Sequence, residues 1–324
     1  MYGYTIFHED ILNSLIKSVR SNLASQTYIF EGDAGLNLLD AAKLFAMALT
    51  CENTDTAPCN TCHVCHESSV GTNPDIIMVE KPSDRKSIGV DPIRDLTADV
   101  IIKPFHGLRK VYIIREGDLL TAEAQNALLK TLEEPPSYAV FIIITTNRNL
   151  MLQTVLSRAT VVFFPPVKDG VIRNYLDEHY PEAQNKEMLV KLAGGIPKEI
   201  DNMMEDEQFY VTRREAAGKL PLLLTKNKLY AFDIQKYLVD NKDDVQKILN
   251  MWILMLRDVL IISLGEADRA INTDLSSELV PLAQKVSPKI LVSAIDEIYS
   301  ALSMLNRNVS LKSVALRLPL RINR

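Results

Sequence analysis

The sequence has no surplus of positive charge. Its 36 Lys and Arg residues are outnumbered by 41 Asp and Glu residues, which gives a formal net charge of -5 at pH 7 and an isoelectric point near 5.7. A protein that holds nucleic acid by its own field needs a basic surface, because contacts with phosphates supply much of the binding energy. Any contact of this chain with DNA is therefore expected to be local or to come through partner proteins.

Long apolar runs are also missing. A membrane-spanning helix needs roughly 18 or more consecutive apolar residues, and the nearest approach, residues 251–264, is interrupted by Arg257 and Asp258. We predict a buried helix there. The first residues, MYGYTIFHEDIL, have neither the basic head nor the long apolar core of a secretory signal, so we expect a cytoplasmic protein.

The chain has the composition of an ordinary globular protein, and its 324 residues suggest two or three domains. The first half contains short runs rich in Val, Ile and Phe, separated by segments with helical patterns. Runs without polar alternation are typical of parallel strands that are covered on both faces, so we predict an α/β fold with a five-stranded sheet. The predicted strands are residues 28–30, 76–79, 111–114, 140–145 and 160–164.

Pro165 and Pro166 directly follow the last predicted strand and cannot donate backbone hydrogen bonds, so a domain is expected to end at residue 166. Beyond it the patterns are helical. We expect a small helical domain over residues 167–206 and a third, all-helical domain over residues 207–324, with long helices at 231–238, 245–264 and 290–305. The predicted fold class is therefore α/β followed by all-α.

Cysteine is confined to one short window. The four cysteines form a C-x7-C-x2-C-x2-C pattern made of Cys51, Cys59, Cys62 and Cys65. Four thiolates at such spacing suit a tetrahedral zinc ion, and a closed four-ligand site leaves no position for an activated water, so we predict a structural zinc module over about residues 51–66. Two disulfides or free thiols are the alternatives. His63 and His66 flank the ligands and are expected to face solvent.

The first predicted strand is followed by Gly32, Gly35 and a helical run, which is the frame of a phosphate-binding loop. The chemistry of that loop is missing. Where a working loop has its second glycine, its lysine and its hydroxyl residue, this chain has Asn37, Leu38 and Leu39. Two leucines provide neither a charge for phosphate nor a ligand for magnesium.

The residues after the predicted strand at 111–114 also lack the groups that an ATPase needs. The strand is followed by Arg115 and Glu116, so a cation stands where an ATPase would have its magnesium carboxylate. We therefore expect no ATP hydrolysis by this chain alone.

Two sequence blocks between residues 109 and 158 carry a resemblance. The words AQNALLKTLEEPP at residues 124–136 and LSR at residues 156–158 resemble the clamp-loader branch of the AAA+ proteins, and the cysteine cluster sits where that family carries its zinc module. The resemblance implies an AAA+ core, a helical lid and a C-terminal helical collar. Asn147 and Lys198, at positions where active relatives sense nucleotide, are expected to be structural here.

The resemblance also implies a role. In this family the arginine that matches Arg158, next to Ser157, stabilises the ATP of a neighbouring subunit, as an arginine finger does. Ala159 replaces the cysteine that commonly follows. The implied partners are gamma/tau-like ATPase subunits and a delta-like subunit in a hetero-pentamer, and the sliding clamp and primed DNA through that complex; ATP is not expected in this subunit.

Two other functions stay open at this point. The chain is alternatively an active or nucleotide-binding AAA+ ATPase subunit, with Glu116 as base and a site around Asn37 and Arg115. A zinc-ribbon DNA-binding protein would instead show strongly salt-dependent DNA binding as a monomer. The acidic balance of the chain speaks against the latter.

Overall fold

The computed structural model describes residues 7–225, 227, 229–307 and 309–322. The chain folds into two compact units, which are described separately. One holds the residues up to Tyr175 together with Gly194–Lys198, and the other holds Leu176–Ala193 together with the residues from Glu199 onward. The three-domain division at residues 166 and 206 stays a prediction.

The first unit is built on a parallel five-stranded sheet, as predicted. Its strands are β1 (Thr27–Gly32), β2 (Ile76–Val79), β3 (Lys110–Ile114), β4 (Ala139–Thr145) and β5 (Thr160–Phe164), in the order β2-β3-β4-β1-β5. Tyr28 of β1 is paired in register with Ile142 of β4 and with Thr160 of β5. The inner strands are almost wholly buried, whereas β5 lies at an edge of the sheet and leaves Phe163 57% exposed.

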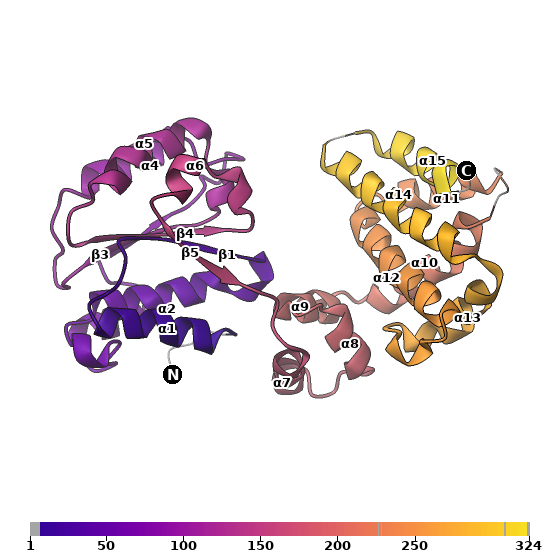
Figure 1. The fold of residues 1–324 in the computed structure, drawn as a ribbon, viewed down its shortest axis with the longest axis horizontal. Helices are drawn as coiled ribbons and strands as arrows, with labels where there is room; N and C mark the ends of the chain where they lie inside the picture. The colour runs from indigo at the N-terminus through magenta and orange to yellow at the C-terminus, as the bar shows by residue number, and fades with distance from the viewer. Residues whose placement is uncertain (1–6, 226, 228, 308, 323–324) are drawn as a thin grey trace. The chain divides into compact units, whose positions relative to one another are not determined.

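Helices cover both faces of this sheet. Figure 1 shows α1 (Glu9–Arg20) and α2 (Leu38–Thr50) on one face and α4 (Val90–Asp99), α5 (Ala122–Glu133) and α6 (Gln153–Leu156) on the other. A short helix, α3 (His63–Ser69), begins within the cysteine window and contains Cys65. The predicted apolar stripe of α5, made of Ala124, Leu128 and Leu132, is buried in the same core cluster as Val155 of α6.

Three shorter helices follow the sheet: α7 (Asp169–His179), α8 (Lys186–Leu192) and α9 (Pro197–Glu205). The Gly-rich break before α9 is tied to the chain that leaves β5, because the Val167 amide donates to the Gly195 carbonyl at 2.8 Å. Gly195 has a φ of +81°, and an added Cβ would lie 2.6 Å from the Val167 carbonyl oxygen. A side chain at position 195 would therefore strain the local backbone and collide with the carbonyl oxygen of Val167.

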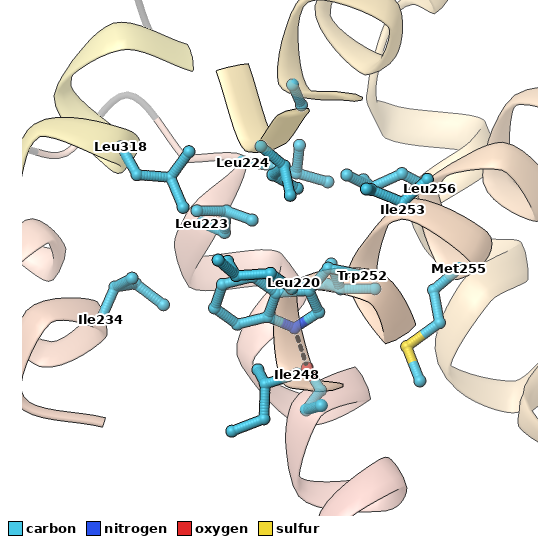
Figure 2. Packing of buried hydrophobic residues seen from close by; sticks show 14 of the residues in the cluster. Leu220, Leu223, Leu224, Ile234, Ile248, Trp252, Ile253, Met255, Leu256 and Leu318 are labelled. Carbon is cyan, nitrogen blue, oxygen red and sulfur yellow. Dashed lines mark hydrogen bonds between the residues drawn. The ribbon is translucent and has the colours of Figure 1, made fainter. Parts of the chain in front are cut away.

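The remaining helices all belong to the second unit. They are α10 (Phe209–Leu223), α11 (Tyr230–Asp240), α12 (Val245–Ser263), α13 (Ser276–Lys285), α14 (Pro288–Asn306) and α15 (Leu311–Ile322). Their core is centred on Trp252, whose indole donates to the Ala216 carbonyl of α10 at 2.8 Å (Figure 2). No helix in the described part of the chain is long and apolar enough to cross a membrane.

The apolar run that begins at residue 251 lies in α12, a core helix as predicted, which ends at Ser263 and leaves Leu264 exposed. Its charged residue Asp258 is completely buried and accepts hydrogen bonds from the amides of Ile271 and Asn272 at 2.9 and 2.6 Å. These bonds replace the water that burial removes. The carboxylate thus anchors the loop that follows α12.

Candidate functional site

The phosphate-loop frame is present at the end of β1. A short 3-10 turn, Ala34–Leu36, follows Asp33, whose side chain accepts a hydrogen bond from the Gly35 amide at 2.9 Å. Asn37 then takes a left-handed conformation with φ of +52° before α2 begins at Leu38. Asn tolerates this conformation better than most residues, so the turn forms without the usual glycine.

Side chains of the same chain pack against both glycines of this loop. Leu38, at the position of the phosphate-binding lysine, is only 4% exposed and belongs to the core. A Cβ added to Gly35 would lie 2.3 Å from Cγ2 of Ile196 and 3.0 Å from Cβ of Lys198. Gly35 therefore permits close packing against the segment before α9, in addition to any role in the turn.

The charged groups at this edge of the sheet are paired with one another. Arg115, at the end of β3, forms an ion pair with Glu80 at 2.8 Å, and Arg148 lies 3.5 Å from the carboxylate of Glu31 in β1. Glu116 is exposed and has a left-handed φ of +53°. Arg115 and Arg148 are thus each paired with a carboxylate of the same chain.

Asn147 is engaged in a local turn. Its side-chain oxygen accepts a hydrogen bond from the Asn149 amide at 3.0 Å, and its own amide donates to the Thr145 hydroxyl at 3.1 Å. The Glu31–Arg148 pair was not foreseen from the sequence. One feature of the sequence is consistent with this pair: Glu31 and Arg148 lie near the ends of β1 and β4, which are neighbours in the sheet.

Arg158 follows α6, the helix that Figure 1 shows on the opposite face of the sheet from α1 and α2, and the Arg158 side chain is one-third exposed. Its Nη1 donates to the Thr154 carbonyl at 2.8 Å and to the Ser157 hydroxyl at 3.3 Å. Its Nη2 donates to the Glu133 carboxylate at 2.6 Å. Glu133 ends α5 and was not singled out from the sequence.

The four cysteines converge, as their spacing predicted. Cys51 follows α2, Cys62 caps the first turn of α3, and the four sulfur atoms all lie within 4.8 Å of one another. Sulfur atoms of a zinc tetrahedron with bonds of about 2.3 Å are about 3.8 Å apart, and those of Cys59 and Cys65 are 4.0 Å apart. This donor set fits a zinc ion and is too open for a disulfide, which requires about 2.05 Å.

Hydrogen bonds already polarise this cluster. The amides of Cys62 and Cys65 donate to the sulfur atoms of Cys59 and Cys62 at 3.3 and 3.4 Å. Hydrogen bonds from Thr61 and Asn53 lower the pKa of Cys59 to about 5, whereas burial raises the pKa of Cys65. A divalent cation would favour the thiolate form of all four cysteines.

The flanking histidines lie outside the group of four. His63 is exposed, and its Nδ1 is 3.6 Å from the Glu67 carboxylate; His66 is exposed as well. Neither is among the residues whose ligand atoms converge. The expectation that both face solvent is confirmed.

In comparisons with known proteins, the chain is similar to subunits of DNA polymerase III. A family model described as "DNA polymerase III, delta subunit" matches residues 7–168, and one described as the C-terminal part of that subunit matches residues 209–313. The chain is 28% identical over 308 residues to DNA polymerase III subunit delta' of Bacillus subtilis, an alignment that covers 94% of this chain and 92% of that one.

A second relative has a different name. The chain is 32% identical over 225 residues to DNA polymerase III subunit gamma/tau of Mycoplasma genitalium, which covers 65% of this chain and 37% of the relative. Among solved structures, a DNA polymerase III gamma subunit-related protein of Thermotoga maritima matches over 97% of this chain and 99% of its own, with 19% identity and a TM-score of 0.45.

Proposed function

This chain belongs to the DNA polymerase III delta-subunit family, and from that premise we propose that it is a delta-prime-like subunit of the clamp loader. It has a role in DNA polymerase III clamp loading, and in our proposal that role is the loading of the sliding clamp onto primed DNA. Its partners are gamma/tau-like ATPase subunits and a delta-like subunit. A hetero-pentamer in the cytoplasm, associated with the replisome, is the proposed assembly.

The chain does not hydrolyse ATP in this proposal. The observation that carries it is the phosphate-loop position, where Leu38 is buried and Ile196 packs against Gly35. A nucleotide would have to displace this packing and would find Arg115 and Arg148 already paired with carboxylates. Hydrolysis also needs a magnesium ligand, and Leu39 offers none at the hydroxyl position.

Arg158 supplies the catalytic contribution of the subunit in trans. Ser157 and Arg158 follow the short helix α6 and are reachable from solvent, unlike a core residue. A planar cation that contacts the transferred phosphoryl group from another subunit stabilises its developing charge. The chain itself therefore remains non-catalytic, while the ATPase activity resides in its neighbours.

The cysteine module serves the fold. Cys51, Cys59, Cys62 and Cys65 would hold a structural zinc ion with no open coordination position. The proposed domains are the AAA+ domain over residues 1–166, the lid over 167–206 and the collar over 207–324.

The rival function is an active gamma/tau-like ATPase, which the similarity to gamma/tau subunits over the first part of the chain favours. Equilibrium binding of magnesium-ATP and its turnover by the isolated chain separate the two. We expect neither binding at micromolar nucleotide nor turnover. Turnover that Glu116→Gln abolishes would instead establish the active ATPase.

A further inference from the structure

Arg158 follows α6 and contacts α5, and hydrogen bonds connect these two helices. The side chain of Gln125, in α5, is 97% buried, donates to the carbonyls of Leu120 and Leu150 at 3.2 and 3.3 Å, and accepts from the Leu152 amide at 2.6 Å. Gln125 thus ties the beginning of α5 to the segment that leads into α6. Because these bonds are buried and satisfied, they hold the two elements in one arrangement.

The far end of α5 meets the arginine directly. Glu133 is the last residue of α5, and its carboxylate lies 2.6 Å from Nη2 of Arg158. The Thr154 carbonyl holds Nη1 at 2.8 Å from the side of α6. The guanidinium is therefore held between both helices, with each of its terminal nitrogens bonded to a different one.

This arrangement leaves donors for a phosphoryl group. A guanidinium has five N–H groups, and the hydrogen bonds to Thr154, Ser157 and Glu133 use three of them. Among the described residues, none accepts from Nε or from the second hydrogen of Nη2. The donors that remain are the Nε–H group and one hydrogen of Nη2, and a guanidinium with two unused donors can still bond the oxygens of a phosphate.

We propose that Glu133 is a positioning residue for Arg158, which it holds in one rotamer with Nε–H and one hydrogen of Nη2 left for the nucleotide of the neighbouring subunit. This inference rests on the function proposed above for Arg158. A free arginine side chain has to lose substantial rotamer entropy when it orders in the transition state. The bonds to Glu133 and Thr154 remove part of that loss in advance, as other positioning contacts in active sites do.

The test uses the reconstituted clamp loader that contains this chain, with ATP turnover measured in the presence of clamp and primed DNA. Glu133→Ala is expected to lower the Arg158-dependent part of kcat roughly two- to fivefold, as for loss of one partly exposed ion pair, with KM for ATP unchanged. Glu133→Gln, which retains an acceptor oxygen, should lose less. Glu134→Ala is the matched control, since Glu134 is exposed and makes no side-chain bond with any described residue.

The double variant Glu133→Ala/Arg158→Ala distinguishes positioning from a general effect on structure. If Glu133 acts through Arg158, the double variant is as slow as Arg158→Ala alone. The inference would be overturned if Arg158→Ala slows the complex but Glu133→Ala leaves its turnover unchanged or makes it faster. The proposed function of Arg158 would then still stand. An intact Arg158→Ala complex with full turnover would overturn both.

Discussion

The absence of a side chain at Gly35 is explained by its contact with Ile196, a residue that is distant in the sequence. A side chain there would overlap Ile196, which lies more than a hundred residues further along the chain. Gly35 stands at a variable position of the phosphate-loop pattern, because the second glycine of a working loop is replaced here by Asn37. In this chain Gly35 serves the approach of a hydrophobic side chain.

Gly35→Ala is therefore expected to destabilise the sheet-containing unit by about 1–3 kcal/mol, because overpacking forces neighbouring atoms to shift. Ile196→Ala removes Cγ2 and should recover part of this loss in the double variant. Urea unfolding followed by far-UV circular dichroism measures both. Gly170→Ala is the control, since no atom lies within 4 Å of a Cβ at that position; an equal loss at Gly170 would contradict the account.

At the scale of elements, two polar clusters connect segments that are separate in the sequence. The cysteine cluster connects the end of α2 to the beginning of α3 across a window that contributes few core residues. In the helical unit, the buried guanidinium of Arg213 in α10 is bonded to both carboxylate oxygens of Asp274 at 2.5 and 2.7 Å. Each cluster makes a prediction about stability.

Zinc is expected at one ion per chain in protein that is purified without chelator. Its removal should increase proteolysis within residues 51–66, because the module has little apolar surface to bury. Elemental analysis and limited proteolysis measure this. Cys62→Ser should lower the zinc content and His66→Asn should leave it unchanged; well under one ion per chain in the unmodified protein would point to free thiols.

The Asp274–Arg213 pair predicts a pH dependence. Burial alone would raise the pKa of Asp274, but the hydrogen bonds and charge of Arg213 outweigh it and lower the pKa below its usual value. A carboxyl group with a lowered folded-state pKa stabilises the fold at pH values above its unfolded pKa of about 3.9. This stabilisation is lost as the pH falls through the folded-state pKa.

Asp274→Asn should therefore lower the free energy of unfolding by roughly 2–4 kcal/mol at pH 7, because Arg213 is left buried without its counterion. The difference from the unmodified protein should shrink below pH 4. The fluorescence of Trp252, the single tryptophan, reports on this unit. Asp268→Asn, at an exposed carboxylate, is the control; a loss that does not depend on pH would argue against the ion pair.

For the whole molecule, sequence patterns were sufficient where the signal is local or periodic. The buried runs of Val, Ile and Phe predicted the strands, and the cysteine spacing predicted the cluster. The contacts Gly35–Ile196 and Glu133–Arg158 could not be predicted in this way. Each joins segments that only the folded chain brings together, and neither leaves a repeating pattern in the sequence.

For the whole molecule, we propose a subunit that acts on the nucleotide of a neighbour and does not hydrolyse one of its own. At the phosphate-loop frame Leu38 is buried and Ile196 packs against Gly35, while the partly exposed Arg158 has N–H donors that no described residue uses. These two features lie on different elements of the same unit. Loss of one function and retention of the other are therefore compatible within one sheet.

The most direct test is ATP turnover of the reconstituted clamp loader with the unmodified chain or with Arg158→Ala, stimulated by clamp and primed DNA, with the isolated chain and Arg109→Ala as controls. The account predicts no turnover by the isolated chain, full turnover with Arg109→Ala, and an assembled Arg158→Ala complex whose neighbouring site is slowed by about a thousandfold or more. Turnover by the isolated chain, or an intact Arg158→Ala complex with undiminished activity, would contradict it.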